Sequence, residues 1–111
     1  MVSFIRKRIM KTREELQAHL EELLGSRNVY FQPATNTKIN YPCIVYKLEE
    51  YEDKYADNKR YISFKKYTIT HIYQKYSSNL QDQFRNSFMF LNGPKPAVAD
   101  GLYHDVYTLY Y

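Results

Sequence analysis

The run from Arg60 to Gln74 constrains the fold of this chain most strongly. It consists largely of β-branched and aromatic residues, which favour strands. Its alternation of apolar and polar residues breaks at Lys65 and Lys66, two adjacent bases of which one would have to face inward. A β-bulge or a bend at that point resolves the conflict. The run therefore predicts the longest strand of a sheet.

Three further segments predict strands, over 28–32, 43–48 and 102–111. The first is ended by Pro33, and the second is nearly continuous in apolar residues, which is typical of a strand covered on both faces or lying centrally. Residues 49–59 are expected to form a charged loop, and residues 95–101 a second loop.

Two segments have helical periodicity. The first spans about 12–24, begins with a capping box of Thr12 and Glu15, and ends at Gly25. The second follows the capping residues 77–79 and is expected to end at 92–94. The apolar stripes consist of Leu16, Leu20, Leu23 and Leu24 in the first segment and of Leu80, Phe84, Phe88 and Leu91 in the second.

The element order α-β-β-β-α-β predicts an α+β fold in a single domain over 1–111. We expect one mixed or antiparallel sheet of about four strands, with both helices packed on one face. A length of 111 residues suits one domain. We expect no membrane association, because the chain has no apolar stretch near the roughly 20 residues that a spanning helix needs and no signal-peptide pattern. Cys43, the single cysteine, allows no intramolecular disulfide.

Residues for catalysis are not evident. The three glycines are isolated and cannot form a phosphate-binding loop. The paired carboxylates of 49–53 have no apolar pocket that would raise a pKa. Cys43 is interpreted as a small buried hydrophobe, and His71 and His104 as half-buried or surface residues on neighbouring strands. No histidine or cysteine pair has metal-ligand spacing. We therefore predict no catalytic, metal or cofactor site and no enzymatic activity.

The chain contains 13 Tyr and 6 Phe but no Trp. Basic and aromatic residues alternate near 59–61 and 65–67, as in a stacking platform for single-stranded nucleic acid. Tyrosine is equally dense where the chain is acidic or neutral, which weakens that interpretation. Aromatic residues are enriched in protein interfaces, so many tyrosines are expected to face another subunit. Tyr110 and Tyr111, at the end of the last predicted strand, are the first candidates.

The net charge of +4 is distributed in blocks of alternating sign. Residues 1–13 and 59–75 carry bases and no acids, and acids cluster between them. Such blocks suit copies of one molecule that meet head to tail, although an ordinary solvated surface is the simpler explanation of any one block. The candidate cross-subunit pair consists of the basic residues Arg6, Lys7 and Arg8 and the acidic residues Glu49, Glu50, Glu52 and Asp53.

Three strings carry a resemblance to a known family. They are Val-Tyr-Phe-Gln-Pro at 29–33, Tyr-Pro-x-Ile-Val-Tyr at 41–46 and Ala-Asp-x-Leu-x-His at 99–104. Over nearly its whole length the chain resembles the small tail-completion, or tail-terminator, proteins of long-tailed bacteriophages. It departs from the family pattern at 75–78, where Asp-Pro is frequent, and at 93–96, where a segment containing Asp-Arg is usual. Both departures are expected in loops.

The resemblance implies a structural role. Tail terminators form a ring, usually of six copies, that caps the tail tube, ends its polymerisation and presents a surface to the head-closure or connector protein. DNA passes through the lumen without sequence-specific binding, and no cofactor is expected. The protein would lie at the head–tail junction of the virion after assembly in the cytoplasm of the bacterial host. A head-closure or connector-adaptor protein of the phage neck is one alternative. A small nucleic-acid-binding domain is an alternative from another class.

Overall fold

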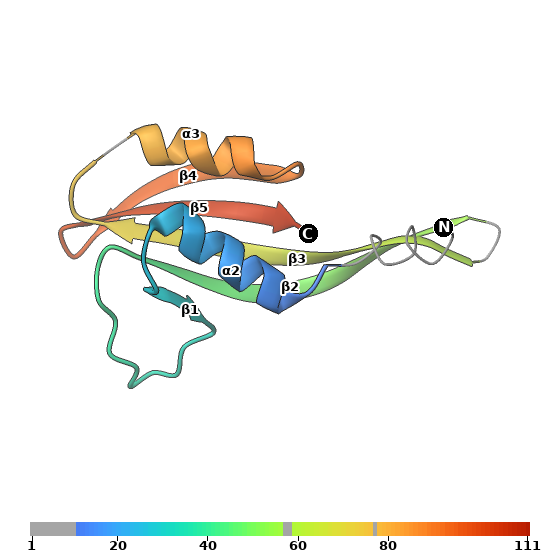
Figure 1. Cartoon of the computed structure of the whole chain (residues 1–111), viewed down its shortest axis with the longest axis horizontal. Helices are drawn as coiled ribbons and strands as arrows, with labels where there is room; N and C mark the ends of the chain where they lie inside the picture. Colours follow the sequence, from blue (N-terminus) through green and yellow to red (C-terminus); the bar gives the residue numbers. More distant parts are fainter. Residues whose placement is uncertain (1–10, 57–58, 77) are drawn as a thin grey trace.

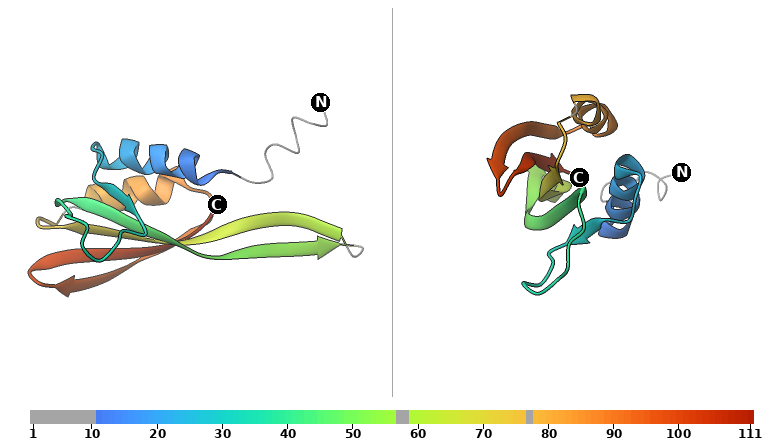
Figure 2. Two further views of the ribbon diagram at one scale, coloured as in Figure 1. Left: turned by 90° about the horizontal axis from the view of Figure 1, so that it is seen from below. Right: turned by 90° about the vertical axis from the view of Figure 1, so that its left-hand side faces the viewer.

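The computed structural model describes residues 11–56, 59–76 and 78–111. They form an α+β fold, as predicted, with both helices on the same side of one sheet (Figures 1 and 2). The elements in chain order are α2 (Arg13–Leu24), β1 (Val29–Phe31), β2 (Cys43–Ala56), β3 (Lys59–Tyr73), α3 (Ser78–Ser87), β4 (Leu91–Ala99) and β5 (Leu102–Tyr110).

The sheet has five strands in the order β1-β2-β3-β5-β4. β1 runs parallel to β2, and the other neighbours are antiparallel. The prediction of about four strands was too low because β4 lies where the sequence indicated a helix end and a loop. Pro94 and Pro96 argue against a strand interior, but they are tolerated in β4 because it is an edge strand.

Helix α3 ends at Ser87, one turn earlier than the periodicity predicted. Phe88 is nevertheless buried in the core. Leu91 already belongs to β4, opposite Leu109 of β5, and packs against the same core. The two residues thus continue the apolar stripe of the helix without being helical, which explains why spacing alone gave the wrong boundary.

The core lies between the two helices and the sheet. Leu16 and Leu20 of α2 are fully buried, as is Phe84 of α3, whose ring stacks on that of Tyr107 with centroids 4.7 Å apart. Thr12 caps the start of α2, as predicted, because its Oγ1 accepts a hydrogen bond of 3.1 Å from the Glu15 backbone N–H. Gly25 ends the helix with a left-handed φ of 77°.

The predicted charged loop over 49–59 is wrong, because β2 continues to Ala56 and β3 begins at Lys59. The two strands extend well beyond the rest of the sheet and lengthen the molecule to 51 Å (Figure 2). A bulge does occur near Lys65 and Lys66, but the extra residue is on the partner strand. Leu48 pairs with Tyr67 and Glu50 with Lys66, so Glu49 is the residue that is bulged out.

Candidate interaction surface

We call residues 49–56 of β2 and 59–66 of β3 the hairpin arm. β1 accompanies β2 only over residues 44–46. β5 accompanies β3 only over residues 66–73, and Tyr111 adds one backbone exchange with Lys65. Beyond these points neither outer edge of the arm has a neighbouring strand among the described residues. The arm therefore projects from the body as a two-stranded ribbon (Figure 1).

The two strands of the arm have opposite charge. The β2 strand carries the predicted acidic block, and the β3 strand carries bases. The strands are complementary within the hairpin, because Glu50 is the register partner of Lys66 and its carboxylate lies 3.6 Å from the Lys66 ammonium. The charged residues are Glu49, Glu50, Glu52, Asp53 and Lys54 on β2 and Lys59, Arg60, Lys65 and Lys66 on β3.

Two of the acids are held by hydroxyl groups of β3. The Glu49 carboxylate accepts a 2.6 Å hydrogen bond from Thr68 Oγ1, which lowers the pKa of Glu49. The Asp53 carboxylate accepts one of 2.5 Å from the buried Ser63 hydroxyl. Both contacts link β2 to β3, so these acids help to hold the ribbon together.

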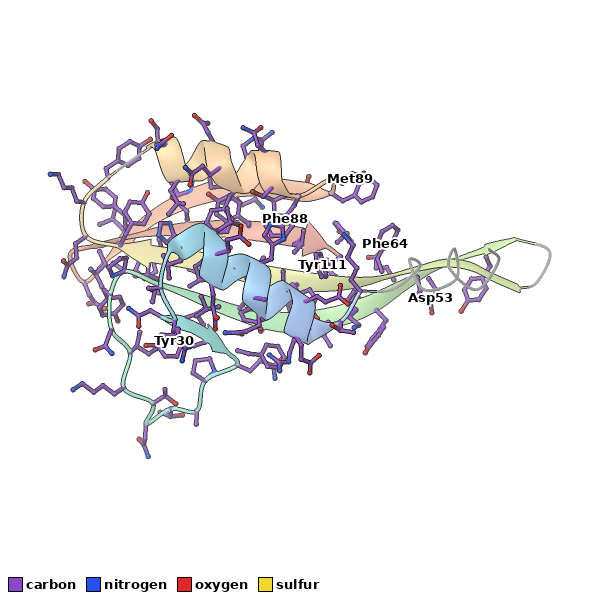
Figure 3. All side chains as sticks on the ribbon, in the orientation of Figure 1. Tyr30, Asp53, Phe64, Phe88, Met89 and Tyr111 are labelled. Atoms are coloured by element: carbon purple, nitrogen blue, oxygen red, sulfur yellow. The ribbon has the colours of Figure 1, made fainter. Side chains whose placement is uncertain are left out.

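The other predicted contact residues lie in different places. Tyr111 packs against the body's own core, with its ring edge-on to Phe88 at 6.1 Å (Figure 3). Tyr110 lies next to it in sequence, half-buried, with the Lys66 ammonium 6.0 Å from its ring centroid. The predicted basic residues Arg6, Lys7 and Arg8 lie outside the described residues.

A group of apolar residues near the base of the arm, of which Met89 and Phe90 are exposed, was not predicted. Phe64 of β3 packs edge-on against Phe90 at 5.4 Å, and Met89 is 87% exposed. Figure 3 shows Phe64 where the arm leaves the body, and Met89 after α3. Sequence reasoning missed this patch because Phe88–Leu91 was assigned to a buried helical stripe.

The sheet face turned away from the helices is open and polar. A shallow depression of about 710 Å³ lies over β2 and β3, lined among others by Val45, Lys47 and Thr70. A second of about 290 Å³ is lined among others by Lys95 and Thr108. Neither depression contains a group of carboxylates and imidazoles suited to acid–base chemistry.

The most deeply buried polar groups lie on β3 and β5. Asp105 is 1% exposed and accepts hydrogen bonds from the Tyr73 hydroxyl at 2.7 Å and from Gln81 Nε2 at 2.9 Å. His71 is the register partner of Asp105. The prediction of a half-buried or surface histidine is wrong for His71, which is 4% exposed because it is enclosed by aromatic rings. Burial lowers its pKa to about 4.

Cys43 is buried at the start of β2, as predicted. Burial raises the pKa of its thiol to about 11, which suppresses the reactive thiolate. We expect the native protein to react with an aromatic disulfide reagent at neutral pH far more slowly than the chain in denaturant. Equal rates in the two states, measured by release of the coloured thiol, would contradict this burial.

Across residues 11–56, 59–76 and 78–111, no group of three or more His, Cys, Asp or Glu side chains could hold a metal ion. Over the same ranges no helix is long and apolar enough to span a membrane. Comparisons with protein-family models, with curated proteins and with solved structures found no match to this chain.

Proposed function

We propose that this chain is a structural virion protein that forms a ring at the head-proximal end of a phage tail tube. In this role it ends tube polymerisation and joins the tail to the head-closure or connector protein. It would be assembled in the cytoplasm of the bacterial host, would allow DNA through its lumen, and would catalyse no reaction.

The projecting hairpin arm is the observation that carries this proposal. An isolated two-stranded ribbon is marginally stable in water, and its unpaired edges are templates for association. Such an arm is stabilised when further copies or partners cover it. Its strands carry charges of opposite sign, which suits a contact between different surfaces of identical copies, and such a contact forms a ring when the rotation closes.

The resemblance to tail terminators supports the viral setting. Its three strings coincide with elements of the described fold. Residues 29–33 include β1, residues 41–46 include the start of β2, and residues 99–104 include the turn between β4 and β5. In that turn Asp100 and Gly101 both have positive φ, of 54° and 71°. The strings thus fall on β1, on β2 and at the β4–β5 turn, whereas the departure at 93–96 lies within β4 and not in the expected loop.

Size-exclusion chromatography with light scattering tests the proposal. We expect the full-length chain to elute as a discrete multimer whose mass is constant over a tenfold concentration range. A strict monomer at all concentrations that binds DNA in a salt-sensitive manner would instead support the nucleic-acid-binding alternative. A monomer that binds no DNA would also contradict the ring.

A further inference from the structure

We propose that the hairpin arms of neighbouring copies pair edge to edge, with β2 of one copy beside β3 of the next. The inference rests on the ring-forming function proposed above and names the contact that would join the copies. Its starting observation is that, among the residues that the structure describes, neither outer edge of the arm has a neighbouring strand, whereas the inner edges pair with each other along the arm.

The backbone of the arm offers hydrogen-bonding groups to such a neighbour. On β3, Lys65 uses its outward N–H and C=O in an exchange with Tyr111. Outward groups alternate along an antiparallel strand, so the next pair toward the tip belongs to Ser63, which has no described strand beside it. On β2, the Leu48 N–H donates to Gln32 Oε1 at 3.1 Å, and beyond that point no described strand lies beside this edge.

Charge selects which edges meet. Pairing β2 with β2 of another copy would set acids against acids, and pairing β3 with β3 would set bases against bases. Like charges on directly opposed residues of adjacent strands are destabilising, whereas opposite charges are favourable. Only the β2–β3 combination is complementary, and the hairpin already uses it in the Glu50–Lys66 ion pair. The symmetric dimers are therefore disfavoured.

The geometry of this pairing permits closure. Within one hairpin β2 and β3 are antiparallel, so an identical hairpin placed alongside continues an antiparallel sheet. Each copy then uses both edges of its arm, and in a closed ring no edge of an arm stays unpaired. The outer strands of the body are poorer sites for strand addition, because β4 carries Pro94 and Pro96 and β1 has three residues.

Two charge variants test the pairing, used singly and as a mixture. The first makes the arm basic on both strands, with Glu50→Lys and Glu52→Lys. The second makes it acidic on β3 as well, with Lys59→Glu, Arg60→Glu and Lys65→Glu. Alone, each variant places like charges across every junction between copies, and we expect assembly to require at least tenfold more protein. In an equimolar mixture the junctions become complementary, and we expect assembly to return.

Restoration in the mixture distinguishes contacts between copies from effects within the hairpin, because each hairpin still carries its own altered charges. Sedimentation velocity measures the mass, and the thermal transition of each variant reports whether its body is folded. If the wild type assembles and each variant alone assembles equally well, the proposed pairing is overturned but the proposed ring is not. A mixture that stays monomeric although both variants fold would also overturn it. A monomeric wild type would overturn the ring itself.

A measurement on the unaltered protein provides a second test. Hydrogen exchange of the backbone amides of 59–64 should be slower in the assembled protein than in a dilute monomeric sample. Equal exchange in the two samples would overturn the pairing. The matched control is Lys38→Glu with Lys95→Glu, two exposed bases outside the arm, which should leave assembly within about twofold. Loss of assembly in that control, with assembly of the two arm variants intact, would overturn the pairing.

Discussion

Replacing Phe84 with alanine is expected to lower the free energy of unfolding by about 3–5 kcal/mol, the usual cost of truncating a buried phenylalanine. Phe84 is fully buried, and its ring stacks on Tyr107 and lies 5.9 Å from the His71 ring. The substitution removes the apolar contact that joins α3 to the centre of the sheet. The total free energy of unfolding of a small domain is only about 5–15 kcal/mol. We therefore expect a large fall in the urea midpoint.

The matched control for this prediction is Phe90→Ala. Phe90 is the same residue type, but half of its surface is exposed, and its aromatic contact is with Phe64 near the arm. Its truncation is expected to lower stability much less. Equal urea midpoints for the two variants would contradict the burial assigned to Phe84.

Replacing His71 with phenylalanine is expected to reduce the protein's loss of stability between pH 6.5 and pH 4. The pKa of His71 is lowered from 6.5 to about 4 by burial, so in this range the unfolded chain binds more protons than the folded one. The contribution of the neutral His71 side chain to stability is therefore fully present above pH 6.5, and it is lost as the pH decreases toward 4. At 1.36 kcal/mol per pKa unit the loss is about 3 kcal/mol.

The same substitution should not lower stability at neutral pH. Neither ring nitrogen of His71 has a hydrogen-bond partner among the described residues, and the ring packs against Tyr73 and Phe84. A phenyl ring keeps these contacts without unsatisfied polar atoms. His104→Phe, on the opposite face of the sheet, is the control and should keep the acid-dependent loss. Identical urea midpoints for wild type and His71→Phe at pH 4.5 would contradict this account.

The sequence predicted those elements whose local signals agree with their environment. Helix α2 has a capping residue, an apolar stripe and a terminal glycine, and β3 has a long run of strand-forming residues. β4 could not be predicted in the same way. Its prolines disfavour a strand interior, and only its place at the edge of the sheet makes them acceptable.

The hairpin arm was missed for a related reason. Glu49, Glu50, Glu52 and Asp53 have low strand propensity and suggested a solvated loop. They nevertheless lie on a strand paired with β3, where Glu50 is opposite Lys66, and Glu52 and Asp53 are opposite Phe64 and Ser63. The charge blocks were visible in the sequence, but their first partner is the adjacent strand of the same chain. This intrachain complementarity became apparent only from the pairing of β2 with β3.

The burial of His71 also depended on tertiary structure. The sequence placed His71 on the correct strand but did not show how deeply its side chain is buried. That burial depends on the rings of Phe84 of α3 and of Tyr73. The tyrosines divide in a similar way. Tyr46, Tyr67 and Tyr107 fill the core, whereas Tyr51 and Tyr55 are exposed on the arm. The number of tyrosines in the sequence does not show which of them are buried and which are exposed.

Electron micrographs of the purified full-length chain test the central claim most directly, because they show both the closure and the number of copies. The account predicts uniform closed rings with a central opening, present at low salt and diminished when high salt screens the charged arms. Fields that contain only monomer-sized particles at every protein concentration and salt concentration would contradict it.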